Sequence, residues 1–141
     1  MASKVFNPQP NPSASTTAVI DDPLPSSCYY LHSSYNSSLI LVPEPLTSEN
    51  FHSWFRYLNM AFTIKNKLGF VDGSIKEPEV NPRSSLHAHW NRCNTVVITW
   101  ILNCVSKQIH ASVLYKPTAY IIWKELQEKF SQSKWSLDLS T

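Results

Sequence analysis

The chain has 141 residues, which is room for one ordinary domain with some length left for tails. Charged residues make up 16% of it and the net charge is +2, which excludes a highly charged disordered protein and a strongly basic nucleic-acid binder. Three irregularly spaced cysteines exclude a disulfide framework or a zinc ribbon.

The N-terminal part differs in composition from the rest of the chain. Seven of the ten prolines lie in residues 1–45, together with most of the Ser and Thr clusters. We expect residues 1–27 to form a disordered tail and residues 28–45 an extended arm along the domain. Residues 39–42 are apolar enough for a short strand, although no partner strand is evident.

The same region lacks the apolar core of a secretory signal, and the longest apolar run, at residues 96–105, has about half the length of a membrane span. We therefore expect a soluble, cytoplasmic protein with no membrane partner.

A first helix is predicted between Leu46 and Gly69. Polar residues near position 50 suit its start, and Gly69 stands where a C-terminal cap belongs. Its inward face follows the i, i+3, i+4, i+7 spacing of an amphipathic helix: Phe51, Trp54, Phe55, Leu58, Ala61 and Phe62.

This helix also has a second apolar flank. At 100° per residue, Tyr57, Met60 and Ile64 widen its apolar side beyond what one packing neighbour would cover. The three side chains are therefore candidates for a self-association surface, unless another helix of the same domain covers them.

Three further helices are predicted after a proline-broken loop. They begin after Ser85, Ser106 and Thr118, each of which suits an N-cap position. The last helix should turn its apolar face inward through Ala119, Ile122, Trp123, Leu126 and Phe130. The fold class is therefore all-α: a compact bundle of about four helices, spanning residues 46–132, after the disordered Pro/Ser-rich arm and before a divergent tail at residues 133–141.

Nucleic-acid binding finds limited support in the charge distribution. Residues 46–141 hold eleven basic and seven acidic residues, a net charge of +4, whereas residues 1–45 have a net charge of −2. Arg56 and Lys67 fall on one polar face of the first helix and are weak phosphate-contact candidates. Most nucleic-acid binders concentrate far more charge, so an ordinary solvated face is the simpler explanation of the pair.

Metal binding and catalysis find less support. On a helix His87 and His89 point in opposite directions, and His89 with Cys93 at i, i+4 lacks a third ligand nearby. Gly69 and Gly73 are the only glycines, so no glycine-rich phosphate loop exists. We expect no enzyme, no metal, no cofactor and no small-molecule substrate.

Two long motifs resemble the Gag polyprotein of plant Copia-type retrotransposons. The first is LILVPEPLTSENFHSWFRYLNMAFTIKNKLGFVDGSI, and the second is HWNRCNTVVITWILNCVSKQIHASVLYKPTAYIIWKELQEKFSQ. They stand in the family's order and extend the resemblance over about residues 22–132. The final residues, SKWSLDLST, depart from the family pattern, so we expect a truncated, solo or degenerate Gag fragment.

The resemblance implies an N-terminal, capsid-like Gag region that forms homo-oligomers around RNA. It supplies no catalytic residues, and the RNA-binding zinc knuckle of the family is not in this sequence. Our leading hypothesis is a non-enzymatic structural protein. The alternatives are an RNA-binding or host adaptor protein derived from Gag, or a non-functional relic.

Overall fold

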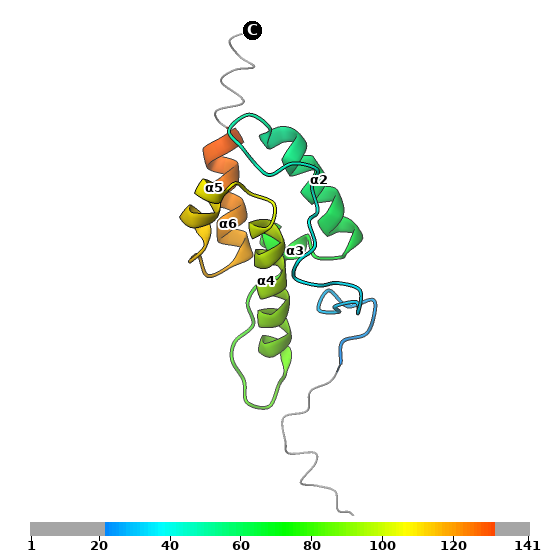
Figure 1. Ribbon diagram of the computed structural model, residues 1–141. Coiled ribbons are helices and arrows are strands. Elements are labelled where there is room, and N and C mark those ends of the chain that lie inside the picture. Colours follow the sequence, from blue (N-terminus) through cyan, green and yellow to red (C-terminus); the bar gives the residue numbers. More distant parts are fainter. Residues whose placement is uncertain (1–21, 132–141) are drawn as a thin grey trace, which may run out of the picture.

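A computed structural model of the protein describes residues 22–131, to which every structural statement here refers. This part of the chain holds five α-helices, followed by one π-helical turn, and no β-strand (Figure 1). The all-α prediction is confirmed. The predicted tails fall largely on residues 1–21 and 132–141, which lie outside the described part.

The arm ahead of the first helix runs beside α2 and α4 (Figure 1). Residues 22–50 form turns and extended stretches, and the strand considered at residues 39–42 is not formed. A parallel bridge joins Leu46 to Val105, with the Leu46 amide 2.9 Å from the Cys104 carbonyl oxygen. Leu46 and Val42 are buried, so the end of the arm belongs to the core.

The first helix, α2, spans Phe51–Ile64 and buries one apolar stripe. Phe51, Trp54, Leu58 and Phe62 are buried as predicted, and Phe55 is half-buried against Trp123, with ring centroids 4.9 Å apart. The start differs from the expected side-chain cap. The Asn50 side chain instead binds residues that precede the helix. Its Oδ1 accepts from the Thr47 main-chain amide at 2.8 Å, and its Nδ2 donates to the Pro45 carbonyl at 2.9 Å.

The prediction that Gly69 ends this helix is wrong. The helix stops at Ile64 because Asn66 takes a left-handed conformation with φ 58°, which Asn tolerates better than most residues. Gly69 instead opens a short extra helix, α3, Gly69–Asp72, where a Cβ would collide with the Ile75 side chain. Gly73, with φ 86°, ends α3.

The remaining helices are α4, Leu86–Leu102; α5, Lys107–Val113; and α6, Ala119–Leu126, which continues into the π-helical turn η2, Gln127–Ser131. Ser106 and Thr118 cap α5 and α6 as predicted, whereas the Ser85 side chain makes no cap bond to α4. The expected inward face of α6 and η2 is buried throughout.

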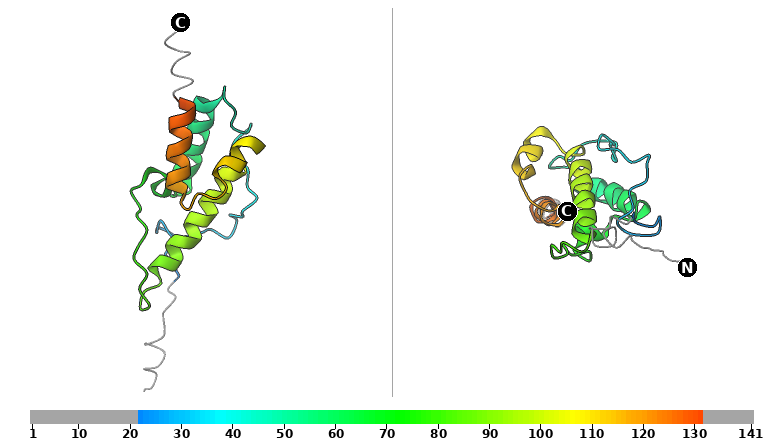
Figure 2. Two further views of the ribbon diagram at one scale, coloured as in Figure 1. Left: turned by 90° about the vertical axis from the view of Figure 1, so that its left-hand side faces the viewer. Right: turned by 90° about the horizontal axis from the view of Figure 1, so that it is seen from below.

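The core lies where α4 and α6 meet α2 and α3, and α4 extends beyond the ends of α2 and α6 (Figure 2). Trp54, Trp90, Trp100 and Trp123 are all buried, as expected for core tryptophans. None of the helices in residues 22–131 combines the length and apolar character that crossing a bilayer requires.

Candidate interaction surface

The second apolar flank of α2 is open to solvent. Tyr57 is 44% exposed, Met60 42% and Ile64 82%, so the rest of the described chain leaves much of each side chain open to solvent. Helical spacing places the three within a narrow sector of the helix surface, beside the stripe that α2 buries in the core. We call these three residues the α2 patch.

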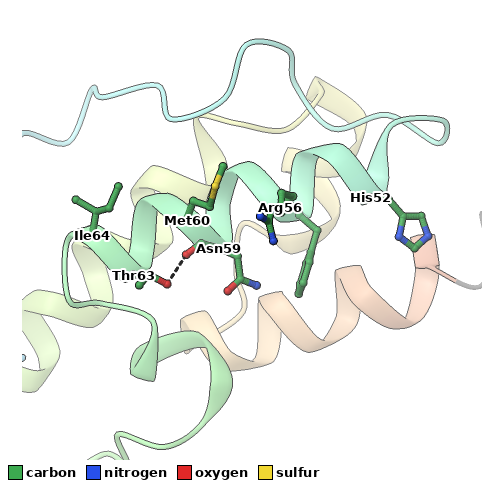
Figure 3. A pocket seen from close by; sticks show the side chains of 7 residues that line it. His52, Arg56, Asn59, Met60, Thr63 and Ile64 are labelled. Carbon is green, nitrogen blue, oxygen red and sulfur yellow. Dashed lines mark hydrogen bonds between the residues drawn. The ribbon is translucent and has the colours of Figure 1, made fainter.

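An open groove runs along the outer side of α2 next to this patch. Met60 and Ile64 line it together with polar side chains of the same helix (Figure 3). Within the groove, the Thr63 hydroxyl donates a hydrogen bond to the Asn59 main-chain carbonyl at 2.7 Å. Tyr57 lies on the far flank, where it borders a smaller hollow with Pro43 and Glu44. The patch is thus a ridge between two hollows.

Of the two phosphate-contact candidates, Arg56 lies at this groove and Lys67 does not. Arg56 is exposed and lines the groove, and α2 contains no acidic residue to neutralise it. The placement of Lys67 on the same polar face is wrong, because α2 ends at Ile64 and Asn66 reverses the backbone. Lys67 is only 1% exposed, so its ammonium is not presented to an external phosphate.

The Lys67 ammonium is occupied inside the protein. It donates to the Tyr30 carbonyl at 2.6 Å and to the Lys65 carbonyl at 3.3 Å. Desolvation lowers the pKa of Lys67, an effect that the nearby Cys93 and Cys28 thiols oppose. A buried ammonium needs such acceptors, because an unpaired charge in the interior is costly. Lys67 therefore fastens the arm to the helices.

The cysteine and histidine positions form no metal centre. In residues 22–131 no three His, Cys, Asp or Glu side chains come together in a way that would hold an ion. His87 pairs with Glu77 at 2.8 Å, and the Cys93 thiol donates to the Tyr29 carbonyl at 3.3 Å. Burial raises the pKa of the Cys93 thiol to about 11, so it is a protonated thiol at neutral pH.

Sequence reasoning missed the side chains that hold the arm. Asn103 donates to the Ser37 carbonyl at 2.6 Å and to the Leu39 carbonyl at 3.2 Å, and the Trp100 indole donates to the Asn36 carbonyl at 2.8 Å. These bonds join residues more than sixty positions apart. The sequence gives one indication of these bonds: a buried Trp indole needs a hydrogen-bond acceptor.

The segment from the arm to the loop after α3 also matches a known family. Residues 32–79 match the family model of the Gag-polypeptide of LTR copia-type. The match supports a Copia-type Gag region over this segment. No curated protein and no solved structure matches the chain.

The match gives the α2 patch a family context. The Copia-type Gag region includes most of the arm, all of α2 and all of α3. The patch and Arg56 therefore lie within the matched segment, whereas α4, α5 and α6 lie outside it. The likeness of residues 89–132 to Gag stays a prediction from their sequence.

Proposed function

We propose that this chain is a non-enzymatic structural module that associates with copies of itself through the α2 patch, in the manner of a capsid-forming Gag region. The observation that carries the proposal is the exposure of Tyr57, Met60 and Ile64 on a helix of the Copia-type Gag region. Exposed apolar side chains that gather on one face mark contact sites more often than scattered ones do. A cytoplasmic location remains part of this proposal.

The contact should be weak in a single pair of copies. A stable interface buries about 800 Å² on each partner, which three side chains cover only in part. A shell tolerates weak contacts because each copy makes several of them at once, which raises the overall avidity. We therefore expect association that depends on concentration rather than a permanent dimer.

The test is a triple variant, Tyr57→Ala, Met60→Ala and Ile64→Ala. We expect the association constant to fall about 10- to 100-fold, since each factor of ten corresponds to about 1.4 kcal/mol. The variant should keep a cooperative melt, because exposed positions contribute little to stability and Ala favours the helix. Loss of the melt would show that the three residues belong to the core.

A matched control is available outside α2. Leu114, Tyr115 and Ile121 are also exposed, and they present one tyrosine and two aliphatic side chains in the turn after α5 and on α6. Replacing these three by Ala should leave association unchanged. If both triple variants weaken association equally, the effect is general apolar stickiness and the α2 patch is not the contact.

RNA binding is the second candidate, and the exposed Arg56 favours it. A guanidinium in a groove without a nearby acid on its own helix suits a phosphate. Binding of RNA should then fall steeply with salt, and Arg56→Gln should reduce the salt slope by about 1. RNA affinity that does not respond to this change would remove Arg56 from the contact.

A further inference from the structure

The arm is held by side chains that bind its main chain. Five side chains of the helical part donate to arm carbonyl oxygens, at 2.6–3.5 Å, and we call these five residues the arm seat: Asn66, Lys67, Cys93, Trp100 and Asn103. The carbonyls they reach belong to residues 26, 29, 30, 36, 37 and 39. These donors bind main-chain oxygens, so an identical arm carried by another molecule would present the same acceptors.

Aromatic contacts add specificity to this seat. The Tyr35 ring meets the Trp100 ring edge to face, with centroids 5.6 Å apart, and the Lys65 ammonium lies 4.4 Å from the Tyr35 ring centre. Nearer the start of the arm, Tyr29 makes an edge contact with Phe70 at 6.0 Å. The arm therefore lies on the helices as a bound peptide would, with ring and cation contacts to its aromatic side chains.

The arm has little structure of its own. Its main-chain hydrogen bonds within residues 24–39 are turns that span three residues, such as the bond from the Tyr35 amide to the His32 carbonyl at 2.9 Å. The hydrogen bonds that join this stretch to distant parts of the chain come from side chains of the arm seat. Leaving the seat would thus break contacts to the helices without breaking a helix or a sheet within the arm.

A short, stiff link joins the arm to the helices. Pro43, Glu44 and Pro45 are exposed, whereas Val42 before them and Leu46 after them are buried. Proline fixes its own φ and restricts the residue before it, so this link has few conformations. Short, constrained links are common hinges for domain swapping. A link with few conformations does little to favour the arm's return to its own chain over its packing on another copy.

We propose that the arm seat also receives the arm of a second copy, so that copies are joined by arm exchange. The proposal rests on the proposed self-association and names a contact that adds to the α2 patch. Every bond and ring contact of the seat is available to an identical arm from another molecule. If each arm passes to the next copy, the link is head to tail and can close into a ring or continue.

The test uses the unmodified full chain and the Tyr35–Trp100 contact. Carbon-13-labelled and unlabelled chains are unfolded together, refolded, and studied by isotope-filtered nuclear Overhauser spectroscopy in the smallest associated species. We expect ring-proton cross-peaks between Tyr35 of one isotope class and Trp100 of the other. Associated chains that show this contact only within one isotope class would overturn arm exchange while leaving the α2 patch intact. A strict monomer would overturn both.

A variant with a longer link gives a second readout. Inserting Gly-Ser-Gly-Ser between Glu44 and Pro45 should lower the intermolecular cross-peaks, because a flexible link raises the effective concentration of the arm at its own seat. The same insertion between Pro82 and Arg83, in the exposed loop before α4, is the control and should leave them unchanged. Unchanged cross-peaks in the Glu44 variant would contradict exchange through this link.

Discussion

The clearest single test of how the arm is held is the substitution Asn103→Leu. Asn103 ends α4, and its amide nitrogen donates to the Ser37 carbonyl at 2.6 Å and to the Leu39 carbonyl at 3.2 Å. Leucine has nearly the same shape, carries no charge and cannot donate, so only the two hydrogen bonds are removed. The helices should stay folded while the arm separates from them more often.

The size of the effect follows from the two bonds. Each contributes about 0.5–1.5 kcal/mol net, and because Asn103 and Ser37 are exposed, water replaces part of the loss. We expect a cost of about 1–2 kcal/mol, which raises the population of the detached arm by a factor of roughly 5–30. Hydrogen exchange of the arm amides, including the Leu39 amide that bonds the Asn36 carbonyl, should accelerate by the same factor.

The matched control is Asn91→Leu, an identical change at an exposed position of the same helix. Its arm amides should exchange at the wild-type rate. The reasoning is refuted if Asn103→Leu and Asn91→Leu accelerate arm exchange equally, or if Asn103→Leu melts the helices together with the arm.

Two further predictions concern backbone conformation and titration. Asn66 has φ 58°, so Asn66→Ala should lower the free energy of unfolding by about 1 kcal/mol in urea denaturation. Asn66→Gly should cost less than Asn66→Ala, and equal losses would contradict the backbone explanation. The pKa of Cys93 is raised from 9.0 to about 11, so the folded state binds the thiol proton more tightly than the unfolded state. Its contribution to stability should therefore be complete below pH 9 and decline as the pH rises from 9 towards 11. The alkaline loss of stability should be shallower in Cys93→Ala, where the other buried thiols still contribute. Equal alkaline slopes in the two proteins would refute this.

The inward faces of the helices could be predicted because apolar periodicity decides which side is buried. The stripe of α2 through Trp54, Leu58 and Phe62, and the capping of α6 by Thr118, both follow from local sequence rules. The exposure of the α2 patch does not follow from the sequence, since spacing alone does not show whether a neighbour covers a flank.

The end of α2 and the role of Lys67 could not be predicted by the same rules. A left-handed Asn66 substitutes for the glycine that usually ends a helix, so the pattern pointed to Gly69 instead. Lysine is almost always exposed, and the burial of Lys67 is compensated by two carbonyl acceptors, one of which, on Tyr30, lies thirty-seven positions away. Hydrogen bonds from side chains to the main chain of distant residues form only in the assembled fold. They produce no periodic pattern in the sequence from which they could be predicted.

Light scattering of the purified chain across a concentration series, with and without RNA, tests the central proposal most directly. We predict that the average mass of the wild-type chain rises with concentration, and that the variant with Ala at Tyr57, Met60 and Ile64 stays at lower mass under the same conditions. A wild-type chain that stays monomeric at every concentration and does not respond to RNA would contradict both self-association and the RNA-binding alternative.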